Sequence, residues 1–222
     1  MNYIVFDLEW NQPQDGKPTE SRKLAFEIIE IGAVKLNERF AIIDKYDQLI
    51  RPQVYQEINW RIKKMLGLKR GELSAGRLFP RAASEFFEWC GEDPVWCTWG
   101  SQDISELRRN MKYYGMSEID DNAEIPYINV QKLYGIHIGN TAQSKALEAA
   151  VDELELPKNV PFHRAYGDAY YTAKVLESLP DELRNNNLCY DKPAPPKAKA
   201  HRKGRAGRRV IRGRVRNNKS EL

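Results

Sequence analysis

Near its start the chain runs through a short apolar segment, Tyr3 to Phe6, and then presents two acids separated by one residue, Asp7 and Glu9. An apolar run without a polar face predicts a strand covered on both sides, so the fold must be a sheet between other layers. In extended chain, residues two apart project to one face, and both carboxylates would meet at the end of this strand. Close carboxylates repel unless a cation lies between them, and oxygen ligands suit Mg²⁺ or Mn²⁺. The segment alone is equally compatible with a strand end that carries solvated acids.

Charge is distributed unevenly between two parts of the chain. Residues 192–222 carry twelve Lys or Arg and one acid, a charge of +11, whereas residues 1–191 stand at −7, so the net +4 is a difference between unlike parts. From residue 185 onward the composition shifts to Pro, Ala, Gly, Lys and Arg, and such a segment buries too little apolar surface to offset its ordering entropy. We therefore expect a folded domain over residues 1–184 and a disordered basic tail over residues 185–222.

Strand-like and helix-like segments alternate along the first part, which is typical of an α/β domain. Besides the first strand, we expect strands at residues 26–36, 39–49, 95–99 and 125–130, the first two of these forming a hairpin. We expect helices at residues 81–90, 103–114, 145–153 and 165–179. Residues 53–80 have a roughly helical spacing of apolar side chains that glycines interrupt, and no element is assigned to them.

Three further residues suit a site built with the opening acids. Asp103 follows the strand at 95–99, at a strand-to-helix junction, where open α/β sheets place their ligand crevice. His163 lies in the loop before the last helix, and Asp168 lies in the first turn of that helix. The histidine and the acid could therefore share one pocket from different elements.

Together these residues resemble the three motifs of the DEDDh class of DnaQ-like 3′–5′ exonucleases: Asp7-Leu8-Glu9, then Asp103, then His163 with Asp168. The resemblance covers about residues 1 to 180, and the segment from Glu27 to Ala33 resembles the second strand of the family. The residues around the first two motifs, Asp7 to Asn11 and Trp99 to Asp103, look most like the Eri-type and KapD-like branch. Members of that branch trim structured or single-stranded RNA ends.

The resemblance implies an RNase H-like fold, a mixed five-stranded sheet with its second strand antiparallel and helices on both sides. It also implies hydrolysis with two divalent ions, Mg²⁺ or Mn²⁺, that clamp the attacking and leaving oxygens. On the family pattern Asp7 would bridge both ions, and Glu9 and Asp168 would bind the one that activates water. Asp103 would support the other ion.

His163 would be the general base on the family pattern, because an imidazole with a pKa of about 6.5 suits proton transfer near neutral pH. The alternative is a structural histidine. For the substrate, Leu8 is expected to contact the terminal sugar and base, and Trp10 and Phe26 are candidates for stacking on bases. For these three residues core packing is an equal alternative. The other four tryptophans, Trp60, Trp89, Trp96 and Trp99, are expected to pack in the core.

The predicted function is a metal-dependent 3′–5′ exonuclease acting on single-stranded nucleic acid with a free 3′ end. RNA is favoured over DNA because of the branch resemblance and the arginine-rich tail. That tail could lay its charges along phosphates and raise affinity, or it could be a solubilising segment or an anchor to ribosomes or another acidic partner. Two other functions remain open, a DNA-directed exonuclease and a catalytically weak regulatory protein that binds nucleic acid on the same fold.

Cysteine usage and hydropathy indicate the compartment. Cys90, Cys97 and Cys189 form no CxxC pair, and an odd number argues against a secreted disulfide framework. No apolar run approaches the ~20 residues of a membrane span, and the early acids interrupt any signal-peptide core. We expect a soluble, cytoplasmic protein without a membrane partner, and the sequence leaves its oligomeric state open.

Overall fold

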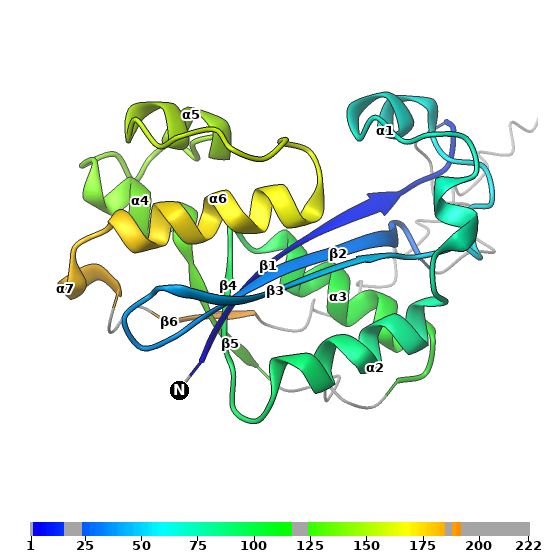
Figure 1. Cartoon of the computed structure of the whole chain (residues 1–222), viewed down its shortest axis with the longest axis horizontal. Helices are drawn as coiled ribbons and strands as arrows, with labels where there is room; N and C mark the ends of the chain where they lie inside the picture. Colours follow the sequence, from blue (N-terminus) through cyan, green and yellow to red (C-terminus); the bar gives the residue numbers. More distant parts are fainter. Residues whose placement is uncertain (1, 16–23, 117–123, 185–187, 192–222) are drawn as a thin grey trace, which may run out of the picture.

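The strands of the protein form one mixed sheet (Figure 1). The structure, a computed structural model, describes residues 2–15, 24–116, 124–184 and 188–191. Within these residues the sheet has six strands in the order β3-β2-β1-β4-β5-β6. β1, β4 and β5 are parallel, whereas β2, β3 and β6 pair antiparallel to their neighbours. The bounds are β1 Tyr3–Asn11, β2 Glu27–Leu36, β3 Ile42–Leu49, β4 Val95–Thr98, β5 Ile125–Asn129 and β6 Leu188–Asp191.

Helices cover both faces of this sheet (Figure 1). Along β1, Ile4 and Phe6 pack under the first two long helices, and Val5, between them, packs under the later ones. The apolar run of β1 is thus buried on both sides, as its sequence predicts. On one side lie α2 Phe79–Cys90 and α3 Gln102–Tyr113, and on the other lie α4 Val130–His137, α5 Leu147–Glu153 and α6 Ala165–Ser178. The remaining elements are α1 Trp60–Met65, the 3₁₀-helix η1 Glu72–Ala75 and α7 Asp181–Arg184.

The predicted mixed sheet with an antiparallel second strand is confirmed, and several details differ from the sequence prediction. β1 continues to Asn11, so its acids lie within the strand rather than at its end, because β2 continues to pair with it beyond a register shift at Glu9 and Trp10. Residues 53–80 contain α1, η1 and the first residues of α2, and the sequence predicted neither α4 nor α7. Residues 188–191, inside the predicted disordered tail, pair with β5 as β6, and residues 192–222 lie outside the described part of the chain.

Two further predictions concern the side chains of the core. Cys90 and Cys97 are buried free thiols, and burial raises the pKa of Cys90 to about 12. Three of the four tryptophans expected in the core, Trp89, Trp96 and Trp99, do pack against it. The prediction is wrong for Trp60, which is 59% exposed because it begins a short helix that buries only Ile62. None of the described helices is long and apolar enough to cross a membrane.

Two glycines bring the start of α6 into direct contact with neighbouring backbone. A Cβ atom at Gly32 of β2 would lie 1.9 Å from the backbone nitrogen of Tyr166 and 2.1 Å from the carbonyl carbon of Ala165. A Cβ at Gly167 would lie 2.0 Å from the carbonyl oxygen of Pro161, in the loop before the helix. The chain therefore folds the start of α6 tightly against both the sheet and its own preceding loop.

This contact generates a prediction for Gly32→Ala. The added methyl group meets rigid backbone, so we expect a loss of at least about 3 kcal/mol in the free energy of unfolding, the upper end of the cost of over-packing. Gly115→Ala is the control, because Gly115 has a φ of 68° but no neighbour within 4 Å of an added Cβ. That change should cost only about 1–2 kcal/mol for the left-handed conformation. Equal losses in urea unfolding would show that α6 does not depend on this close approach.

Candidate functional site

Three acids from two elements converge beside the start of α6. Asp7 and Glu9 lie two residues apart on β1, and Asp168 lies in the first turn of α6. One carboxylate oxygen from each can be chosen so that all three lie within 4.8 Å of one another. Asp7 is paired in the sheet with Gly32, the residue on which α6 rests, so the glycine contact sets the approach of Asp168 to β1.

Asp103 joins this group from the first turn of α3, at the strand-to-helix junction that the sequence predicts. Its side chain is buried, and its Oδ1 accepts a hydrogen bond of 3.1 Å from the backbone nitrogen of Leu8. This bond ties α3 to β1 between the two strand acids. All four acids line one pocket of about 430 Å³.

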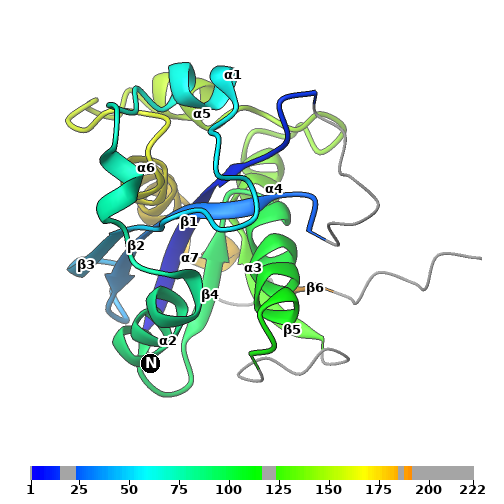
Figure 2. The ribbon, with the colours of Figure 1, turned by 90° about the vertical axis from the view of Figure 1, so that its right-hand side faces the viewer.

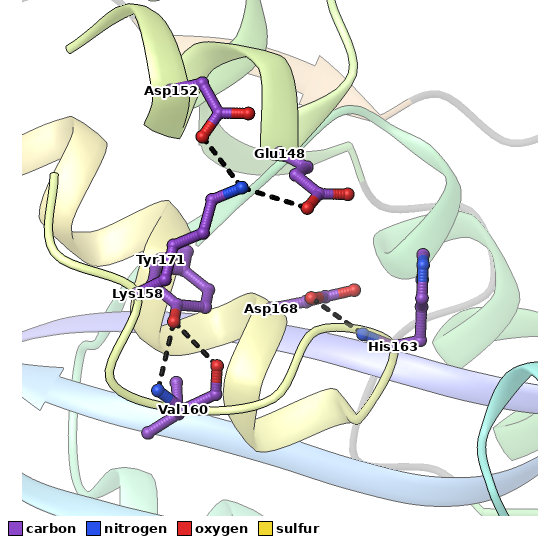
Figure 3. Close-up of polar contacts among 7 residues, drawn as sticks. All are labelled: Glu148, Asp152, Lys158, Val160, His163, Asp168 and Tyr171. Atoms are coloured by element: carbon purple, nitrogen blue, oxygen red, sulfur yellow. Dashed lines mark hydrogen bonds and ion pairs between the residues drawn. The ribbon is translucent and has the colours of Figure 1, made fainter. Parts of the chain in front are cut away.

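His163 lines the same pocket from the loop before α6. It has a φ of 59°, in the left-handed region, and its backbone nitrogen donates to Asp168 Oδ1 at 3.2 Å (Figure 3). Its side chain is exposed, so solvent can reach the imidazole. The structure therefore brings together the five residues predicted to carry the chemistry.

The loop that carries His163 is fixed at further points (Figure 3). Lys158 forms ion pairs with Glu148 and Asp152 of α5, at 3.0 and 2.7 Å. Val160 binds the hydroxyl of Tyr171 on α6 with both backbone groups, its nitrogen at 3.0 Å and its oxygen at 2.6 Å. These contacts hold the loop that carries His163 beside the pocket.

The electrostatics of the pocket favour a cation. Burial is the largest cause that raises the pKa of Asp7 well above its usual range, and the charges of Asp103, Glu9 and Asp168 add to it. Burial also raises the pKa of Glu9 to about 8 and that of Asp103 to about 7, and it raises the pKa of Asp168. Four oxygen-donor side chains that oppose one another's ionisation fit Mg²⁺ or Mn²⁺, which would remove that opposition. The residues present thus fit a divalent metal centre.

Of the three residues predicted to contact substrate, two line the pocket. Leu8 reaches it although its side chain is buried, and Trp10 forms part of the wall. Phe26 is not among the described residues that line the pocket, and its ring lies behind Trp10, with the ring centres 5.8 Å apart. A direct contact of Phe26 with substrate therefore stays a prediction, and its observed partner is Trp10.

The pocket also contains residues that the sequence did not single out for it. Met65 of α1, Trp99 after β4 and Gln131 of α4 complete its walls. The indole nitrogen of Trp99 and the amide nitrogen of Gln131 both donate to the backbone oxygen of Lys145, at 3.2 and 2.7 Å. One signal in the sequence favours a place for Trp99 in the functional site rather than in the core. Trp99 comes directly after a strand and four residues before Asp103.

Arg164, next to His163, links the loop to β2 and η1. Its Nε lies 3.1 and 3.0 Å from the two carboxylate oxygens of Glu30, and another guanidinium nitrogen lies 3.3 Å from Glu72. Glu30 is only 1% exposed and pairs in the sheet with Glu9. Burial raises the pKa of Glu30, and the hydrogen bond from Arg164 lowers it. Arg164 therefore balances the charge of a buried acid, Glu30, beside the four acids of the pocket.

Comparisons with known proteins agree with this geometry. The model of the RNase T family, described as an exonuclease, matches residues 4–176. Among solved structures, the nuclease domain of 3′hExo, a DEDDh family member bound to rAMP, shares 21% identity over 79% of this chain and 90% of its own, with a TM-score of 0.67. A 3′-exonuclease structure on 3′-end-specific recognition of a histone mRNA stem-loop shares 20% identity over 79% and 80%, also with a TM-score of 0.67.

A more distant structural match comes from S. pombe. The Mg²⁺- and Mn²⁺-bound form of Pop2p shares 14% identity over 79% of this chain and 81% of its own, with a TM-score of 0.57. At these identities the structural matches establish the shared fold. A search of curated proteins finds no matching sequence.

The Arg164 contacts generate a prediction for Arg164→Gln. The change leaves Glu30 buried without a charged partner, and breaking a buried pair in this way should cost about 3 kcal/mol of the free energy of unfolding. The double variant Arg164→Gln/Glu30→Gln should recover part of this loss, since it also removes the buried charge. Urea unfolding of the metal-free protein measures both.

Arg77→Gln is the matched control, because it removes an arginine from a more exposed pair with Glu85. Its cost should stay below about 1 kcal/mol. If Arg164→Gln costs no more than Arg77→Gln, the pair with Glu30 does not stabilise the loop.

Proposed function

Because the chain belongs to the RNase T exonuclease family, within the DEDDh superfamily, we propose that it removes nucleotides from the 3′ ends of single-stranded nucleic acid in a metal-dependent reaction, with RNA preferred. The observation that carries this proposal is the convergence of four carboxylates and one histidine in a single pocket. A protein that only bound nucleic acid would not need a cluster of acids that raise one another's pKa values, because such acids also repel phosphates.

The side chains divide the work of hydrolysis. Asp7, Glu9, Asp103 and Asp168 would hold divalent ions, which supply charge neutralisation at the scissile phosphate and lower the pKa of a bound water. His163 accepts a proton from the attacking water at an imidazole nitrogen, because its loop is fixed at the pocket and its ring is open to solvent. Leu8 and Trp10 line the floor and wall against which the terminal nucleotide would lie.

The preference for RNA rests on the lining of the pocket and on the relatives. Ser101, Gln102 and Gln131 bring uncharged hydrogen-bonding side chains to the pocket, and such groups can pair with the ribose 2′-hydroxyl that distinguishes RNA from DNA. Two of the similar structures concern RNA or a ribonucleotide, namely a histone mRNA stem-loop and rAMP. Binding of the basic tail to phosphates and a cytoplasmic location stay predictions.

A denaturing-gel time course tests the proposed function. Matched 5′-labelled single-stranded RNA and DNA are incubated with Mg²⁺, Mn²⁺ or EDTA. We expect a ladder that shortens from the 3′ end, faster on RNA and absent in EDTA. Asp7→Asn should abolish the ladder, and His163→Ala should slow it by about 10²-fold or more, the usual contribution of a general base.

Asp44→Asn is the control for loss of a carboxylate, since Asp44 is an exposed residue of β3 that bonds Trp89. It should degrade RNA at the wild-type rate. A ladder that persists in EDTA, or in Asp7→Asn, would contradict the metal-dependent reaction, and faster loss of DNA would contradict the RNA preference.

A further inference from the structure

A second pocket lies on the other side of α1 from the catalytic pocket. Met65, at the end of α1, lines the catalytic pocket, whereas Lys63 of the same helix lines the second one, of about 490 Å³. We call this second cavity the outer pocket, and its lining comes from Gln14, residues 51–52 and 56–58, Lys63 and residues 68–74. Figures 1 and 2 both place α1 beside the far end of β1, and side chains of α1 line both pockets.

The rim of the outer pocket is basic. Arg51, Lys63, Lys69 and Arg70 are exposed on it, and within the described residues none of the four takes part in an ion pair. Its two acids are Glu57 and Glu72, and Glu72 is already bound by Arg164 and by the backbone nitrogen of Lys69, at 2.9 Å. The rim therefore keeps a positive charge that its own residues do not balance.

The floor of the outer pocket is apolar. Leu68 and Leu73 are buried and Ile58 is partly buried, and they belong to a small hydrophobic cluster beneath α1 that also includes Ile29 and Ile62. A cavity with an apolar floor and a cationic rim matches the two parts of a nucleotide, a flat base and an anionic phosphate.

Trp60 lies on the surface of α1, 59% exposed. It precedes Lys63 by three residues, and residues three apart are neighbours on a helix surface. The helix that carries it is held firmly, because Asn59 caps it and binds the side chain of Asn11 at 2.9 Å, while Gln14 donates to the backbone oxygen of Ile58 at 2.9 Å. The exposed ring of Trp60 therefore lies on a helix whose position is fixed by these hydrogen bonds.

The charge of the catalytic pocket shows why a second binding region is needed. Its four carboxylates repel phosphates, and two bound divalent ions would do no more than neutralise them. Affinity for the strand beyond its terminal nucleotide must then come from residues outside that pocket. Beyond Met65, α1 and the outer pocket offer basic and aromatic side chains.

We propose that Trp60 and the outer pocket bind the stretch of single-stranded nucleic acid that lies upstream of the terminal nucleotide. A base stacks on Trp60, another enters the apolar floor, and the phosphates between them meet Lys63, Lys69 and Arg70. This inference rests on the proposed function, since it assigns the substrate strand to a surface beside the catalytic pocket. The combination of aromatic stacking and a basic groove binds any sequence and weakens with salt.

Equilibrium binding to a strand tests this assignment. The binding measurement uses the full chain carrying Asp7→Asn, so that the strand is not hydrolysed during the titration. This protein is added to a 5′-fluorescein-labelled oligouridylate of twelve nucleotides, and binding is followed by fluorescence anisotropy. Trp60→Ala should raise the Kd at least about fivefold, the low end of the loss of one stacked base. Each of Lys63→Glu, Lys69→Glu and Arg70→Glu should raise the Kd and reduce the slope of log K against log salt by about 1.

Two control variants make matched changes away from the outer pocket. Arg39→Glu reverses one charge in the turn between β2 and β3, at the opposite end of the sheet from α1 (Figure 1). Ile43→Ala truncates another large apolar side chain that is 54% exposed. If the variants of α1 and the outer pocket bind no more weakly than these two, the assignment is wrong.

Photocrosslinking gives a second, independent readout. A strand with 4-thiouridine near, but not at, its 3′ end should crosslink to the peptide spanning residues 58–74. Crosslinks confined to the tail would overturn the assignment. If the wild-type protein fails to shorten RNA but Trp60→Ala still weakens binding, the outer pocket stands and the proposed reaction fails.

Discussion

Mutual repulsion among closely spaced, partly buried carboxylates is the constraint on which the rest of the structure depends. Asp7, Glu9 and Asp168 approach within 4.8 Å because Gly32 lets the start of α6 lie against β2. Folding brings charges together here that would separate in an unconstrained chain, so the packing of β1 and α6 must offset their repulsion. A divalent cation held by these carboxylates would remove this cost, and it would supply the charge neutralisation that the proposed reaction needs.

The protein separates its charges around this centre. Arg164 binds Glu30, which pairs in the sheet with Glu9, and it thereby compensates the charge of a further acid beside the pocket. The basic side chains of the outer pocket lie beyond α1 and do not reach the carboxylates, although one short helix separates the two regions. The acidic catalytic pocket and the basic outer pocket can therefore lie side by side without neutralising each other's charge.

Patterns among neighbouring residues predicted the parts of the fold that depend on short stretches of sequence. Burial on both sides of β1 follows from its apolar run, and the positions of Asp103 and Asp168 in the first turns of two helices indicated that they could join the acids of β1. α1 escaped prediction because six residues are too few for a helix to be stable alone, and contacts from Asn11 and Gln14 hold it. The pairing of Arg164 with Glu30 joins residues far apart in sequence, and no local spacing indicates it.

Titration calorimetry with Mn²⁺ tests the central claim most directly, that the carboxylates of β1, α3 and α6 form a metal centre. The full chain, freed of metal with EDTA and dialysed, should bind Mn²⁺ saturably, and its melting temperature should rise as the ion relieves the repulsion. Asp7→Asn should lose most of the binding heat and most of the rise in melting temperature, whereas Asp44→Asn should keep both. Equal binding and equal shifts in wild type and Asp7→Asn would contradict the account, because the ion would then lie elsewhere.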